Sequence, residues 1–386
     1  MVLKKNMALI SMTSNQKEWL KTITEEIPGF LLKLAVLKKP GRFNHCIKGA
    51  TKLGRKAGLG FSCYALKTYY TLGLWEELGE EQRTKWIDYI NSFQVQGSPL
   101  RVTFDANAFI DPPIIKGVRR RIPLFKRMIY KVLPPKKLTL LQEVLISETK
   151  QAVATLAQIG EEGRNLYSAF PKKPEAVKNH LNLLDWTRPW AAGGQASALV
   201  VLLCTQTPRV LSPKKIQELL EICVTFFDEL VDLNTGAYFS GNASPEYGQL
   251  INGAMKVLTA LDWLEAPVHY PEKLINTCLE QQPDSDGCHL VDAVYVLYRC
   301  AQYTEYKRFE IQSYCLEIMD KIRQHYNGDH GFSYYLGKSQ PSYASLTISK
   351  GLAESDIHGT CLLTWALAMI MELLEYKTPG WYCIRP

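Results

Sequence analysis

Three titratable side chains stand at or near the starts of apolar helical segments and could perform acid–base chemistry. Asp356 and His358 precede the last apolar segment, and Asp292 opens the segment Asp292–Ala301. A carboxyl whose pKa is raised by apolar surroundings can act as a general acid, with a histidine as its hydrogen-bond partner. We therefore predict Asp356, His358 and Asp292 as catalytic residues, with Asp356 bonded to His358 as the acid. Both aspartates could equally cap their helices, because Asp is a common N-cap residue.

Further polar and aromatic residues at comparable positions are predicted to bind the substrate. Aromatic rings can line an apolar cavity, attract a cation or stack on a sugar ring, although they also form ordinary cores. The predicted substrate-binding residues are Asn252, Arg188, Trp186, Gln195, Tyr295, Trp365 and Phe332.

Repeated helices must position these residues. Asn252–Leu261 matches His358–Leu367, since each has a polar residue and a glycine before an apolar helix. Further segments share the frame, two of them without the glycine: Gly58–Leu66, Gly194–Leu202, Ser147–Leu156 and Asp292–Ala301. Six such segments predict a repeat architecture. The starts of the six helices would then surround one opening, where their positive dipole ends favour anions.

A more amphipathic helix precedes most of these apolar segments. The predicted outer helices are Glu81–Phe93, Leu219–Val231, Pro271–Glu280 and Phe309–Tyr326. Their apolar residues recur at three and four spacing, and almost nothing alternates with period two. The sequence therefore predicts an all-α protein.

A helix, a glycine–aromatic turn and a second helix, repeated along the chain, resemble the α/α toroid of squalene cyclases, terpenoid cyclases and protein prenyltransferase β subunits. The turn Asp329-His-Gly-Phe332 resembles the Asp-Gly-Gly-Phe turn of that superfamily. The resemblance implies an α6/α6 toroid as a single domain over residues 1–386, with a basic insertion at 102–138 that has no counterpart in the family.

The resemblance does not carry over the zinc site of the prenyltransferases. Val294 stands at the position of the family's cysteine ligand and Gly359 at the position of its histidine, with His358 one residue early. Cys288 and His289 could replace the missing ligands only as a remote alternative. We expect no metal site, and a magnesium ion is implied only if the substrate is a diphosphate.

Two acidic strings have simpler interpretations. Asp284-Ser-Asp-Gly287 precedes an apolar helix and is interpreted as a turn, while Asp228-Glu-Leu-Val-Asp232 ends an outer helix and is interpreted as a solvated face. The sequence has no phosphate-binding GxxxxGK[ST] loop, no HExxH and no GxSxG.

The net charge of +7 comes from one segment. Residues 116–137 hold nine basic residues and no acid, so the remaining 364 residues carry a net charge of −2. Basic residues interleaved with apolar ones suit an anionic membrane surface, with a solvated loop or outer helix as the alternative. Nucleic acid is not expected as a partner, because the positive charge is confined to this segment.

Hydropathy and cysteine usage predict the compartment. No apolar run reaches the roughly 18–20 residues of a membrane span, and the apolar stretch from Met7 to Met12 is too short for a signal peptide. Ten cysteines without a CxxC pair indicate free thiols in a reducing environment. We expect a cytoplasmic protein, peripheral on a membrane if residues 116–137 bind one.

These observations lead to one main functional prediction and two alternatives. The main prediction is an isoprenoid-processing enzyme of the cyclase or prenyltransferase type, with an apolar prenyl substrate in a central cavity and Arg188 near its anionic head. The first alternative is a carbohydrate-active hydrolase or epimerase that pairs Asp292 with Asp356 and stacks Trp and Tyr rings on sugars. The second is a toroid that binds a partner without catalysis. The oligomeric state stays open.

Overall fold

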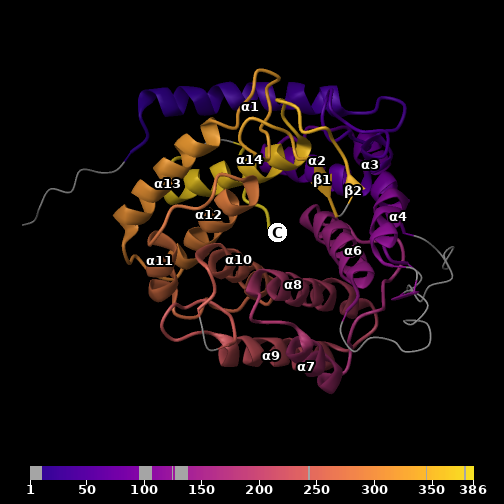
Figure 1. The fold of residues 1–386 in the computed structure, drawn as a ribbon, viewed down its shortest axis with the longest axis vertical. Helices are drawn as coiled ribbons and strands as arrows, with labels where there is room; N and C mark the ends of the chain where they lie inside the picture. Colours follow the sequence, from indigo (N-terminus) through magenta and orange to yellow (C-terminus); the bar gives the residue numbers. More distant parts are fainter. Residues whose placement is uncertain are drawn as a thin grey trace, which may run out of the picture.

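Six helices form a closed inner ring in the computed structural model, which describes residues 11–94, 107–123, 125–126, 138–241, 244–344, 346–377 and 380–386. Each inner helix packs against the next, and the last returns to the first (Figure 1). The ring consists of α2 (Leu59–Thr71), α6 (Leu140–Gln158), α8 (Pro189–Gln206), α10 (Tyr247–Trp263), α12 (Gly287–Ala301) and α14 (Ile357–Leu373).

Each inner helix follows an outer helix in the chain, and the outer helices surround the ring (Figure 1). The outer helices are α1 (Ser14–Leu34), α3 (Glu80–Asn91), α7 (Pro174–Leu183), α9 (Pro213–Leu230), α11 (Pro271–Leu279) and α13 (Arg308–Arg323). Because the chain alternates between the two layers, the inner helices run parallel and begin at the same end. The predicted all-α fold, an α6/α6 toroid, is confirmed.

Small elements decorate this frame. They are the helix α4 (Pro112–Arg121), the 3₁₀ turns η1 (Gly54–Lys56) and η2 (Thr207–Arg209), and the antiparallel strands β1 (Ser342–Tyr343) and β2 (Leu346–Thr347). Strand residue Ser342 pairs with Thr347, and α4 packs against α6 and β2. The predicted insertion at 102–138 lies partly outside the described residues, so its separation from the single domain remains a prediction.

The glycines of the two best-matched repeats allow close packing at the helix starts. A Cβ on Gly253 would lie 2.7 Å from Cβ of Pro189, so this glycine lets α10 approach the start of α8. A Cβ on Gly359 would lie 2.4 Å from the backbone nitrogen of Tyr334, so α14 rests directly on the turn before it. The repeated glycine therefore reflects contact between neighbouring backbones.

All of the inner helices except α2 begin earlier than the repeat frame predicts. Helix α12 starts at Gly287, where the Asp286 side chain accepts a hydrogen bond from the backbone N–H of His289. Asp292 therefore lies in the second turn and does not cap the helix. Asn252 likewise lies in the second turn of α10, which begins at Tyr247. Both side chains thus sit below the opening and not on its rim.

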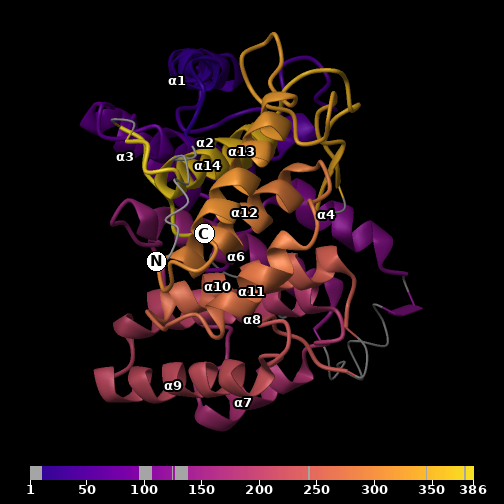
Figure 2. The same cartoon turned by 90° about the vertical axis from the view of Figure 1, so that its left-hand side faces the viewer.

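The two ends of the ring are covered differently. The long connection from α13 to α14 lies at the end where the inner helices begin, and the C-terminal residues lie at the opposite end (Figure 2). There the backbone N–H of Arg385 donates to Gln158 and the indole N–H of Trp263 donates to the Pro386 carbonyl. Within the described ranges, no helix is both long and apolar enough to cross a membrane.

Candidate active site

Asp356 organises the backbone at the start of α14. Its Oδ1 accepts from the N–H of Gly359 at 2.8 Å, and its Oδ2 accepts from those of Tyr334 and Gln340 at 2.8 and 2.9 Å. The side chain is fully buried. Both oxygens are therefore occupied in capping the helix and fixing the loop 334–340, and the predicted hydrogen bond from Asp356 to His358 is absent.

His358 belongs to an aromatic stack at the same end. Its Nδ1 lies 3.0 Å from Oε1 of Gln340, and its ring stacks on Tyr64 and Tyr334 with centroids 4.2 and 5.1 Å apart. Burial lowers the pKa of His358 to about 3, so the ring is neutral near pH 7. This histidine is suited to packing and hydrogen bonding in its neutral form.

Asp292 is a buried carboxyl with one unpaired oxygen. Its Oδ1 lies 3.9 Å from Nζ of Lys256 on α10, and its Oδ2 is sealed from solvent without a hydrogen-bond partner. Burial raises the pKa of Asp292 to about 6, although the charges of Lys256 and His289 oppose the shift. A carboxylate with this pKa is ionised near pH 7 and basic enough to accept a proton.

Glu148 is a second buried carboxyl that the sequence analysis missed. It lies on α6, accepts a 2.6 Å hydrogen bond from the Tyr343 hydroxyl on Oε1, and has no partner on Oε2. Burial raises the pKa of Glu148 to about 8, which the Tyr343 bond lowers only in part. Glu148 is therefore mostly protonated near pH 7, and its position in the predicted repeat segment Ser147–Leu156 was the one available signal.

The two carboxyls occupy opposite helices of the ring, since three steps separate α6 from α12 in either direction (Figure 1). Beside Glu148, Tyr343 meets Tyr64 edge-on at 6.2 Å, and Tyr64 stacks on His358 of α14. One wall thus carries an acid in its protonated form, and the facing wall carries a base in its ionised form. Environments that separate two pKa values in this way are typical of acid–base catalysis.

The remaining predicted residues fall into two groups. Asn252, Gln195, Tyr295 and Trp365 lie on inner helices, where Asn252 Nδ2 and Gln195 Oε1 have no hydrogen-bond partner. Tyr295 donates to Asp262 at 3.2 Å and packs against Trp365. The residues in this group accompany Asp292 within the ring.

The second group lies away from Asp292. Trp186 donates to the Leu181 carbonyl and packs on Phe226 of α9, while Phe332 is buried against Trp19 of α1. Both fill the layer between inner and outer helices. Arg188 is exposed at the start of α8.

The side chains that commonly bind metal ions do not gather into a metal centre in the part of the chain that the structure describes. There, no group of three or more His, Cys, Asp and Glu side chains could hold a metal ion. The expectation about magnesium depended on a diphosphate substrate and is not tested.

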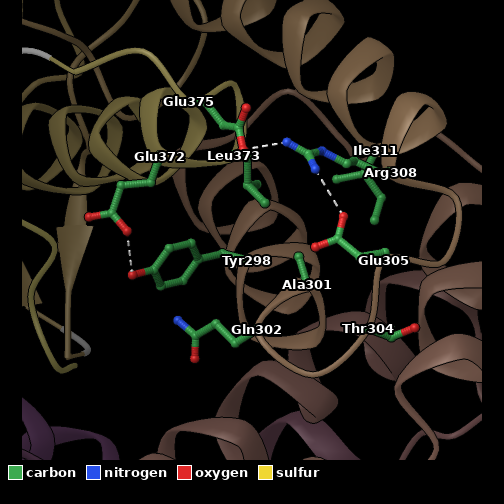
Figure 3. A pocket seen from close by; sticks show the side chains of 10 residues that line it. All are labelled: Tyr298, Ala301, Gln302, Thr304, Glu305, Arg308, Ile311, Glu372, Leu373 and Glu375. Atoms are coloured by element: carbon green, nitrogen blue, oxygen red, sulfur yellow. Dashed lines mark hydrogen bonds and ion pairs between the residues drawn. The ribbon is translucent and has the colours of Figure 1, made fainter.

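A pocket of about 210 Å³ lies at the other end of the ring, beside the C-terminal ends of α12 and α14 (Figure 3). Arg308 forms ion pairs with Glu305 and Glu375 across it, and Tyr298 donates to Glu372. Arg308 is thus paired with two carboxylates and Glu372 with a hydroxyl group, so we assign this pocket no catalytic role.

Comparisons with known proteins bear on the fold. No protein-family model matches the chain, and neither does any curated protein. A possible GH105-family member from Salmonella enterica serovar Paratyphi A is 12% identical over 98% of this chain and 100% of its own, with a TM-score of 0.44. A mutant unsaturated glucuronyl hydrolase from Streptococcus agalactiae is 12% identical, covering 98% and 95%, with a TM-score of 0.46. The GH76A α-1,6-mannanase from Salegentibacter sp. HEL1_6 is 13% identical, covering 93% and 99%, with a TM-score of 0.41. At such identities the likeness is one of fold.

The prediction of an isoprenoid enzyme was wrong. These solved structures are glycoside hydrolases and not terpenoid cyclases or prenyltransferases. The proposed acid, Asp356, is bonded to three backbone N–H groups and not to His358. The ring also contains carboxyl and ammonium groups that an apolar prenyl chain would have to desolvate. The prediction depended on a fold-level resemblance, and one fold can host several chemistries.

The predicted binding of residues 116–137 to a membrane was part of the isoprenoid prediction, in which the apolar substrate entered the ring from the membrane surface. Most of that segment lies outside the described residues, and α4 contributes only its first part.

Proposed function

We propose that the protein is a carbohydrate-active enzyme that cleaves glycosidic bonds within the ring. Glu148 donates its proton to the oxygen of the departing sugar. Asp292 accepts a proton from a water molecule, whose oxygen bonds to the anomeric carbon as the glycosidic C–O bond breaks. This general acid–base scheme replaces the Asp292–Asp356 pair expected from the sequence, because Asp356 has no free oxygen.

One observation carries the proposal. Two buried carboxyls on facing inner helices each keep one oxygen without a partner, and burial raises their pKa values to about 8 and about 6. Burying an unpaired polar atom costs free energy of folding. Two such oxygens on facing helices therefore indicate a functional role for the carboxyls and not a stabilising one. The likeness to glycoside hydrolases is limited to the fold, and the proposal depends on these side chains.

The surroundings suit a sugar better than an apolar chain. Tyr64 and Tyr334, which stack on either side of His358, provide aromatic walls, and Asn252 and Gln195 provide unpaired amide atoms that can bond hydroxyl groups. Binding sites commonly combine aromatic walls with a few polar groups that fix the orientation of the ligand.

The test is turnover of a panel of neutral and acidic oligosaccharides, with products identified by mass spectrometry. We expect cleavage by the wild type and a loss of about 100-fold or more in Glu148→Gln and Asp292→Asn. Glu229→Gln is the matched control, because this exposed residue lies on the outer helix α9. Full activity in both ring variants would exclude this acid–base pair, and the absence of any cleaved sugar would refute the proposed function.

A further inference from the structure

Three lysines from different inner helices interact with one another electrostatically. Lys67 lies on α2, Lys150 on α6 and Lys256 on α10. Tyr64 lies three positions before Lys67 and Asn252 lies four positions before Lys256, so these two lysines share a helix face with residues of the candidate site. The three ammonium groups are close enough for Lys150 to interact electrostatically with both of the others.

Opposite charge is scarce around this lysine cluster (Lys67, Lys150 and Lys256). Only Lys256 has a carboxylate nearby: its Nζ lies 3.9 Å from Oδ1 of Asp292, which is long for an ion pair. Among the described residues, neither Lys67 nor Lys150 forms an ion pair or hydrogen bond, and no carboxylate is among the groups that act on them. The groups that favour a charged Lys67 are the thiols of Cys361 and Cys63, and burial raises their pKa values to about 11 and about 12, so they are uncharged near pH 7.

The cluster nevertheless remains open to water. Lys256 keeps 28% of its side-chain surface exposed, and Lys150 is half-buried. Burial, together with the charges of the other two lysines, lowers the pKa of Lys150 well below its ordinary value. Lysines in such surroundings destabilise the protein, since three like charges are partly desolvated and only Lys256 has a carboxylate, Asp292, beside it.

We propose that Lys67, Lys150 and Lys256 together bind an anionic group, a carboxylate or a phosphate, carried by the substrate. That the anion belongs to a sugar rests on the proposed function, whereas the anion site itself rests on the lysine cluster. Asn252 lies one helical turn before Lys256 and is 1% exposed. Its side-chain Nδ2 has no hydrogen-bond partner, so it offers a further donor beside the site.

The anion would hold the sugar in one orientation between the two carboxyls. Asp292 contacts Lys256, so an anion on the cluster would place the neighbouring part of the sugar beside the proposed base. An opposite charge also favours the protonated form of a lysine, so binding should be accompanied by proton uptake.

The experiment is isothermal titration calorimetry of the full chain with glucuronic acid, glucose 6-phosphate, glucose and inorganic phosphate, in two buffers of different ionisation enthalpy. The variants are Lys67→Met, Lys150→Met and Lys256→Met, which keep the length of the side chain and remove the charge. Lys214→Met is the matched control, because Lys214 is exposed on the outer helix α9. Thermal denaturation shows that each variant is folded, and we expect Lys67→Met and Lys150→Met to be at least as stable as the wild type.

We expect one or both anionic sugars to bind at least about tenfold more tightly than glucose, with net proton uptake. Each methionine variant of the cluster should weaken that binding about tenfold or more, and Lys214→Met should not. Preference for glucuronic acid or for glucose 6-phosphate identifies which anion the substrate carries.

Two results would overturn the inference. One is equal binding of glucose and the anionic sugars, or no binding of any anion, by the wild type. The other is unchanged binding in all three cluster variants. Binding of inorganic phosphate through the lysines, without any cleaved sugar in the turnover panel, would retain the anion site and refute the carbohydrate function.

Discussion

Replacing Glu148 with glutamine should change the pH dependence of stability in a defined way. In the unfolded chain this carboxyl ionises near pH 4.5, whereas in the folded protein burial raises its pKa to about 8. Between these values the folded state holds a proton that the unfolded state has lost. The free energy of unfolding of the wild type therefore falls as pH rises through this window and is unaffected by Glu148 below it.

The magnitude follows from the two pKa values. They differ by about 3.5, and each unit corresponds to about 1.4 kcal/mol, so the full penalty is about 5 kcal/mol above pH 8. Between pH 5 and pH 8 the penalty grows by about 3.5 kcal/mol. Glutamine does not titrate and still offers an oxygen to the Tyr343 hydroxyl. Asp292 titrates in both proteins, so its contribution cancels in the difference.

The assay is urea denaturation of the wild type and Glu148→Gln at pH 5 and pH 8. The stability of the variant relative to the wild type should rise by about 3.5 kcal/mol from the lower to the higher pH. Glu229→Gln, on the surface of α9, should show no comparable change. A difference between Glu148→Gln and the wild type that is independent of pH would mean that Glu148 ionises normally, and the proposed acid would be lost.

Three further substitutions test how the ring is held together, each by urea or thermal denaturation. Asp356→Ala leaves three buried N–H donors without an acceptor and should cost about 4 kcal/mol, and a cost below about 1 kcal/mol would contradict its role as a cap. Gly359→Ala places a Cβ 2.4 Å from the Tyr334 nitrogen and should cost about 3 kcal/mol, whereas a neutral effect would mean that α14 does not rest on this turn. Arg385→Ala removes a partly exposed ion pair to Asp262 at 3.7 Å and should cost no more than about 1 kcal/mol. A larger loss would show that the C-terminal segment stabilises the ring through more than this charge.

The architecture could be predicted from the sequence because its repeats are local. Each polar–glycine start and apolar helix, such as Asn252–Leu261 and His358–Leu367, is visible in a single window. The glycines could be recognised, but the contacts that require them, Gly253 on Pro189 and Gly359 on the turn at Tyr334, join distant parts of the chain.

The candidate site was only partly predictable for the same reason. Asp292 was identified by its place at an inner helix, and its assignment stays a prediction. Asp356 matched the same pattern, yet the backbone donors of Tyr334 and Gln340 come from a loop whose path the sequence does not specify.

The most informative residues were missed because their meaning depends on ring closure. Glu148 and Lys150 are ordinary charged residues within an apolar segment until α6 takes its place opposite α12. Their position within the predicted repeat segment Ser147–Leu156 was the available signal, and Lys67 directly follows another such segment, Gly58–Leu66. The function was mispredicted because the fold supports several chemistries, and only the side chains within the ring distinguish them.

The central claim, that Glu148 and Asp292 act as acid and base, is tested most directly by the pH dependence of kcat/KM for a cleaved oligosaccharide. Asp292 must be ionised and Glu148 protonated, so activity should rise through about pH 6 and fall through about pH 8. Glu148→Gln and Asp292→Asn should remain folded and lose this activity across the range. A profile without limbs near these values, together with activity that survives both substitutions, would contradict the account.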